Sequence, residues 1–131
     1  MDKEPERFDA EEALAACVEN LEELKSLDQP QLSLVLDRAK SKIHKTFEAV
    51  LKAKYQSLVW TITEMLYGPK ALNRAYEDCC FRSVSVQYYP KDVLILLLEK
   101  AKSNVSKTGT HEQSVLRELV PMLEGLIEDQ S

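Results

Sequence analysis

The residues that most often carry enzyme chemistry are few and widely spaced in this chain of 131 residues. Its two histidines are His44 and His111, and each stands beside charged neighbours. Nucleophilic catalysis needs a nucleophile next to a base that a third group orients. The sequence contains no Gly-Xaa-Ser-Xaa-Gly turn, and its three glycines form no phosphate-binding loop. We therefore expect both histidines to lie on the surface of a protein that is not an enzyme.

The cysteines and the paired acids do not form metal or glycosidase motifs. Structural zinc is usually bound by Cys-Xaa2-Cys pairs, whereas Cys79 and Cys80 are adjacent and Cys17 is far from both. Such cysteines are typical of small buried side chains. Adjacent acids such as Glu22 and Glu23 lie in polar stretches, which is typical of solvated helix faces. The sequence predicts no catalytic residue, no metal site and no cofactor.

A basic segment is the best candidate for contact with an anionic partner. Residues 38–54 carry six basic side chains and one acidic one. On a helix that advances about 100° per residue, four of them share the side opposite the apolar face: Arg38, Lys42, Lys45 and Lys52. This basic stripe could contact phosphates. A solvated or internally neutralised face is favoured instead, because no aromatic residues interleave with the stripe and the chain has a net charge of −5.

Aromatic residues gather in the middle of the chain. Trp and Tyr anchor many protein interfaces because they bury a large area at a modest entropic cost. They are equally common in cores, and their helical spacing here slightly favours the core. The candidate partner-binding residues are Trp60, Tyr67, Tyr88 and Tyr89.

Helices are expected to position these side chains. Asp9 is a favourable N-cap residue, and Glu12 occupies the capping-box position, so a helix is predicted from about Asp9 to Leu27. Neither Gly nor Pro occurs between Pro30 and Tyr67, and the apolar residues there keep helical spacing. One long helix is predicted, with a break near residues 52–56 as the alternative. Gly68-Pro69 should end it.

The second half of the chain has the pattern of further helices, expected at about residues 69–80 and 90–104 and from Thr110 through the apolar residues as far as Ile127. The segment Val93–Leu98 is apolar all round, which places it at the centre of a bundle. Pro121 should kink or split the last helix. Residues Ser83 to Tyr89 alternate with a period of two, and a connector or helix tail is favoured over an edge strand.

These elements predict one all-α domain over residues 1–131, a bundle of about five helices with one long central helix at about 30–67. Residues 1–8 are expected to fray. The polar residues before the first helix are not those expected of a signal sequence, and no apolar run approaches the roughly 20 residues of a membrane span. Three unevenly spaced cysteines indicate reduced thiols. A soluble intracellular protein of the cytoplasm or nucleus is therefore expected.

The function that this pattern favours is a protein–protein interaction module, an adaptor or assembly subunit of a larger intracellular complex. Its partner would be another protein, with a helix or an extended segment held in a groove on an apolar and aromatic helical surface. A homo- or hetero-oligomer is compatible with the same surface. The alternative is a nucleic-acid-associated factor that contacts phosphates through the basic stripe.

Overall fold

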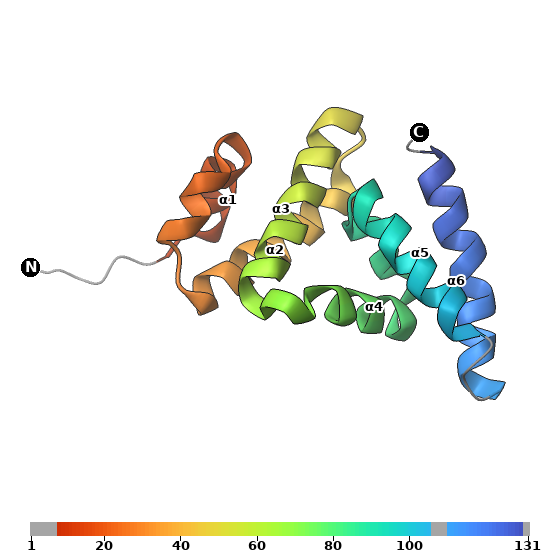
Figure 1. Ribbon diagram of the computed structural model, residues 1–131. Coiled ribbons are helices and arrows are strands. Elements are labelled where there is room, and N and C mark those ends of the chain that lie inside the picture. Colours follow the sequence, from red (N-terminus) through yellow and green to blue (C-terminus); the bar gives the residue numbers. More distant parts are fainter. Residues whose placement is uncertain (1–7, 106–109, 130–131) are drawn as a thin grey trace, which may run out of the picture. The chain divides into compact units, whose positions relative to one another are not determined.

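The computed structural model describes residues 8–105 and 110–129, and every regular element in these ranges is a helix (Figure 1). Six are α-helices: α1 (Ala10–Glu19), α2 (Gln29–Lys45), α3 (Ala49–Tyr67), α4 (Ala71–Phe81), α5 (Lys91–Val105) and α6 (Thr110–Asp129). Three are short 3-10 helices: η1 (Leu21–Ser26), η2 (Gly68–Lys70) and η3 (Ser83–Tyr88). The predicted all-α class is confirmed. The predicted fraying of residues 1–8 lies outside the described residues, apart from Phe8.

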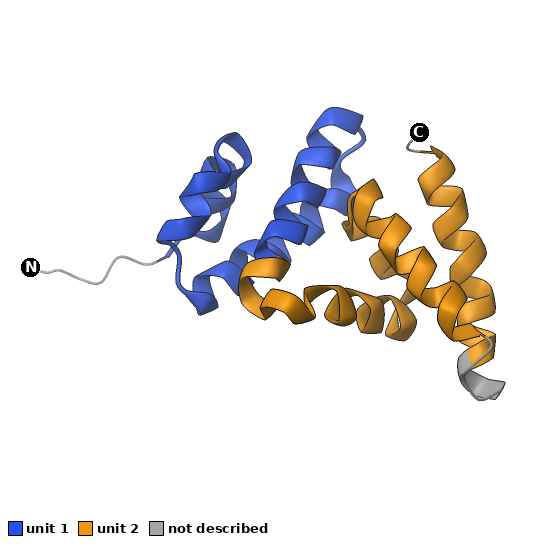
Figure 2. Cartoon of the chain, viewed as in Figure 1, with its two compact units in different colours: residues 1–62 blue, residues 63–131 orange. Residues whose placement is uncertain are grey.

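The chain divides into two compact units, with the boundary inside α3 (Figure 2). Unit 1 runs to Ile62 and contains α1, η1, α2 and most of α3. Unit 2 starts at Thr63 and contains the end of α3 and all later elements. The expectation of a single domain stays a prediction.

The first helix starts where the sequence predicts and ends earlier. The Asp9 carboxylate accepts hydrogen bonds from the backbone N–H groups of Glu11 at 3.0 Å and Glu12 at 3.2 Å, which satisfies two of the unpaired donors of the first turn. The predicted extension to Leu27 is wrong. Asn20 has an extended backbone, and its side chain accepts from the Glu22 N–H at 3.1 Å, so Asn20 starts η1.

The predicted bundle of about five helices is confirmed, but the long central helix expected at about 30–67 is two helices, α2 and α3. The backbone of Thr46 is extended, and its hydroxyl donates to the Lys42 carbonyl at 2.6 Å. That bond satisfies a carbonyl at the end of α2 that has no partner within the helix. The side chain of Phe47 is 97% exposed in the link that follows. The alternative break at residues 52–56 is also wrong, because α3 is continuous there.

In unit 1, α1 packs along α2. The sharp start of α2 comes from a complete capping box. The Asp28 carboxylate accepts from the Gln31 N–H at 2.9 Å, and the Gln31 side chain accepts from the Asp28 N–H at 3.0 Å. The buried side chains of α1, η1 and α2 are mostly apolar and include Leu14, Cys17, Leu24, Leu32, Val35, Ala39 and Ile43.

In unit 2, α5 packs against α6, and α4 contacts both. The buried residues of α5 are Val93, Leu94, Leu97 and Ala101, while Ile95 and Leu96 are exposed. The apolar segment of α5 is therefore buried on one face, not all round. This face, together with Leu116, Leu119 and Leu123 of α6, supplies much of the core of the unit.

Two sequence expectations in unit 2 are corrected. The segment expected to be a connector, a helix tail or an edge strand is the 3-10 helix η3, and no strand occurs within the described residues. The predicted split at Pro121 does not occur, because α6 is a single helix from Thr110 to Asp129. Proline removes the hydrogen bond to the carbonyl of Arg117. Both residues are exposed, so water can bond to that carbonyl instead.

Candidate functional site

Unit 1 contains an apolar groove of about 450 Å³ between two helical walls. One wall consists of Val18 of α1 and Leu21 of η1, and the other consists of Val50, Ala53, Lys54 and Ser57 of α3. We call this surface the α1–α3 groove. In Figure 2 both walls lie within the blue unit.

The groove exists because α3 has two faces that carry apolar or small side chains. Leu58 and Ile62 belong to the buried face. Val50, Ala53 and Ser57 recur at steps of three and four residues, so they align on a second face about a quarter-turn or more away. The middle of this second face is hollow because Ala and Ser carry the smallest side chains after glycine.

The groove is open to solvent along its length. The side chain of Val50 is 64% exposed and that of Leu21 is 44% exposed. Pockets for small molecules usually cover about 70–90% of the ligand surface. A groove as open as this one would leave much of a small molecule exposed to water. An amphipathic helix needs cover on one face only. The shape of the groove therefore suits a helix better than a small molecule.

One positive charge faces the groove. Lys54 is the only ionisable residue among those that line it. The ammonium group of Lys54 is exposed and makes no ion pair with a described residue. An occupant with a carboxylate at this wall would gain an ion pair without breaking one that these residues already make.

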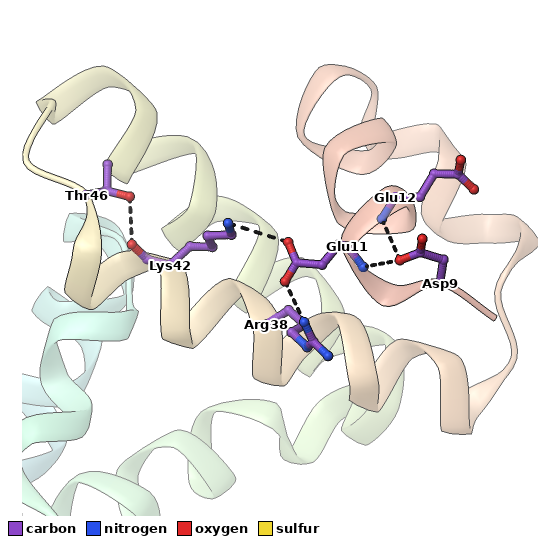
Figure 3. Close-up of polar contacts among 6 residues, drawn as sticks. All are labelled: Asp9, Glu11, Glu12, Arg38, Lys42 and Thr46. Atoms are coloured by element: carbon purple, nitrogen blue, oxygen red, sulfur yellow. Dashed lines mark hydrogen bonds and ion pairs between the residues drawn. The ribbon is translucent and has the colours of Figure 1, made fainter. Parts of the chain in front are cut away.

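The face of α1 that carries Val18 also carries an ion cluster, since Glu11 lies two helical turns earlier. The Arg38 Nη1 atom is 2.6 Å from Glu11 Oε2, and the Lys42 Nζ atom is 3.4 Å from Glu11 Oε1 (Figure 3). The hydrogen bond from Arg38, with a smaller contribution from Lys42, lowers the pKa of the Glu11 carboxyl below its ordinary value. Two cations around one carboxylate leave this cluster with a net positive charge.

The structure divides the residues of the predicted basic stripe. Arg38 and Lys42 both contact Glu11 of α1, so an acidic helix neutralises part of the stripe. Lys45 is exposed in the last turn of α2, and Lys52 lies beyond the break, on α3. The prediction that all four lie on one side of a continuous helix is wrong, because the break at residues 46–48 changes the direction of the chain between the third and the fourth.

The four aromatic candidates are divided between the two units. Trp60 is half-buried in unit 1, and the other three belong to unit 2. The exposed ring of Tyr67 lies under the guanidinium group of Arg74, 5.1 Å from it, and Tyr88 is half-buried. Tyr89 is 1% exposed, and burial raises the pKa of its hydroxyl far above the ordinary value. Tyr89 is therefore a core residue and is removed from the candidate surface.

The remaining reactive residues are scattered. His44 is exposed, and the side chain of His111 lies outside the described part of the structure. The three cysteines are free thiols, and burial raises the pKa of Cys17. Within the described residues, no three His, Cys, Asp or Glu side chains lie close enough together to hold a metal ion. No described helix combines the length and the apolar character that a membrane span requires.

The chain matches no protein-family model, no curated protein and no solved structure.

The residues of the α1–α3 groove were not among the sequence candidates. Val18 and Leu21 fit the apolar face of a helix continuing to Leu27, and Val50 fits the apolar face of one long helix. The available signal was the spacing of Val50, Ala53 and Ser57. That spacing marks a separate face only when the helix is known to begin at Ala49.

Proposed function

We propose that this protein is a protein–protein interaction module that binds a helical segment of a partner in the α1–α3 groove. It acts as an adaptor or assembly subunit and not as an enzyme. The observation that carries the proposal is the groove itself, whose walls are apolar, exposed and only partly covered by the described chain.

The energetics of the groove support this proposal. Burying apolar surface contributes roughly 25 cal/mol per Å², so the exposed side chains of Val50 and Leu21 gain free energy when a partner covers them. Phe47 precedes α3 by two residues and is almost wholly exposed. A large aromatic side chain at this position can add to the same interface, because aromatic residues are enriched among interface hot spots.

The alternative proposal, contact with nucleic acid through the basic stripe, has weaker support. Arg38 and Lys42 already share the carboxylate of Glu11, and Lys52 lies on another helix. Binding through the four residues would weaken steeply as salt rises. The main proposal includes a location in the cytoplasm or nucleus. The three free thiols support this location, because these compartments keep cysteines reduced.

The proposal predicts partner capture that depends on the groove. The test variant is the double substitution Ala53→Gln with Ser57→Gln, which places two polar amides in the groove. Both positions are exposed, and Gln is a good helix former, so we expect folding to be retained. The matched control is Ser33→Gln with Ser41→Gln on exposed positions of α2. Each chain is immobilised, exposed to nuclease-treated extract of its source cells, and washed at low and high salt.

We expect the unmodified chain and the control to retain one protein in stoichiometric amount at high salt, and the groove variant to retain at least tenfold less. Equal retention by the groove variant would place the interface elsewhere and overturn the proposal. Retention of nucleic acid at low salt only, from extract without nuclease treatment and without a protein partner, would favour the basic stripe. Circular dichroism of each variant checks that it is folded.

A further inference from the structure

We infer that the occupant of the α1–α3 groove is an amphipathic helix of another protein with an acidic residue beside its apolar stripe, opposite Lys54. This inference rests on the proposed function and adds to it the chemistry of the partner. Three observations support the inference: the length of the groove, the small residues in it and the positive charge on its α3 wall.

The length of the α3 wall fixes the spacing of the partner's apolar residues. Val50 and Ser57 are seven residues apart, which is roughly 10 Å along the helix axis. That distance corresponds to two turns of a partner helix. Apolar side chains at positions i, i+3 or i+4, and i+7 of the partner would then meet the groove.

The small residues of the groove determine where large partner side chains fit. Ala53 and Ser57 leave space between Val50 on one wall and Val18 and Leu21 on the other. Leu or Phe side chains from a partner helix fill such a space without displacing the chain. The resulting arrangement, in which a helix packs between α1 and α3 within unit 1, is ordinary helix–helix packing.

Charge distinguishes an acidic helix from other occupants. Lys54 faces the groove without an ion pair to a described residue. Glu22, next to Leu21, is already paired with Lys25 at 2.8 Å. A second copy of this chain placed with α3 against α3 would bring two Lys54 side chains into the same interface, which is unfavourable. A partner carboxylate is favourable at the same position.

The test uses a displayed library of 16-residue helices and the full chain as target. Each library member carries Leu, Ile, Phe or Met on one face, and the positions beside this face are randomised among Glu, Gln and Lys. The targets are the unmodified chain, Lys54→Glu, the double Gln groove variant, and Lys45→Glu as a charge-matched control. Lys45 is exposed in unit 1 and does not line the groove.

We expect helices selected on the unmodified chain to carry Glu on one side of the apolar face and to lose at least tenfold in affinity for the groove variant. Lys54→Glu should shift the preference from Glu to Lys by roughly threefold or more, the size expected for an exposed ion pair that changes sign. Lys45→Glu should leave the preference unchanged.

Three results would overturn the inference. The selected helices could depend on the groove but show no preference for Glu, or a preference that Lys54→Glu does not change. Either result would overturn the inference of an acidic partner and leave the proposed function unaffected. Absence of any groove-dependent helix would overturn both. A dimer in sedimentation that the groove variant abolishes would show that a second copy of the chain occupies the groove.

Discussion

At the scale of single residues, Glu11 links the first two α-helices through two exposed ion pairs. Its carboxylate contacts Arg38 at 2.6 Å and Lys42 at 3.4 Å, and both cations belong to α2 (Figure 3). All three side chains are well exposed to solvent, and exposed ion pairs contribute little to stability. Glu11 therefore acts mainly on the register of α1 against α2, while the buried apolar residues supply most of the stability.

The lowered pKa of Glu11 gives a prediction with a definite sign. A carboxyl group whose pKa is lower in the folded state stabilises the fold above its unfolded pKa of about 4.3. This contribution fades as the pH falls through the lower folded value. Arg38→Gln removes the largest cause of the shift, so the pKa of Glu11 should rise towards its ordinary value. The side-chain carboxyl resonance of Glu11, followed by NMR from pH 7 to pH 2, measures it.

Arg74→Gln is the control for this titration, because Arg74 pairs with Asp78 in unit 2 and does not contact Glu11. An Arg38→Gln variant in which Glu11 titrates as in the unmodified chain would contradict the geometry of the pair.

At the scale of elements, α5 offers an internally controlled test of its buried face. Leu96 and Leu97 are neighbours of the same type, but Leu97 is 0% exposed and Leu96 is 45% exposed. Leu97→Ala should lower the free energy of unfolding by about 2–5 kcal/mol, because it removes buried apolar contacts and leaves a cavity. Leu96→Ala should lower it by less than about 1 kcal/mol. Urea unfolding followed by circular dichroism measures both, and equal losses would contradict the assigned face.

The sequence predicts the elements best where a local bond defines their ends. Asp9 starts α1 because its carboxylate bonds to the first turn, and α3 stops before Gly68, which has the positive φ of 56° that glycine tolerates. Both signals depend on residue type alone. The all-α class also follows from the spacing of apolar residues.

The errors arise where competing local bonds have no strong residue signature. At the end of α2 the Thr46 hydroxyl bonds to the Lys42 carbonyl, yet Thr61 makes the same kind of bond to Ser57 inside the continuous helix α3. A threonine within a helical pattern therefore predicts an interruption only weakly. Asn20 uses a different bond: its side-chain oxygen accepts from the backbone N–H of Glu22, which starts η1 directly after α1. Pro121 is the reverse case, since a strong breaker is accommodated on the exposed side of α6.

The candidate groove could not be predicted because it depends on where these breaks fall. If α2 and α3 were one helix, the apolar periodicity of that longer helix would decide which of its faces the residues of the α3 wall belong to. Beginning α3 at Ala49 separates Val50 from the buried face that contains Leu58. The distance from Val50 to Leu21 depends on how α3 packs in the folded unit. The spacing of apolar residues within either segment cannot predict it.

At the scale of the whole molecule, contacts are local along the chain. Each principal pair of packed elements lies within one unit: α1 with α2 in unit 1, and α4, α5 and α6 in unit 2. Short loops close at a low entropic cost, so helical proteins with local contacts fold in microseconds to milliseconds. Temperature-jump or stopped-flow refolding, followed by the fluorescence of Trp60, should show relaxation in this range. Refolding that takes seconds at low protein concentration would indicate rate-limiting contacts of longer range.

The same locality affects synthesis of the chain. The ribosome adds about 5–20 residues per second, far more slowly than a helix pair closes. The α1–α2 pair can therefore bury its apolar residues while the residues of α4 to α6 are still being added. The division of the chain within α3 thus favours folding in the order of translation.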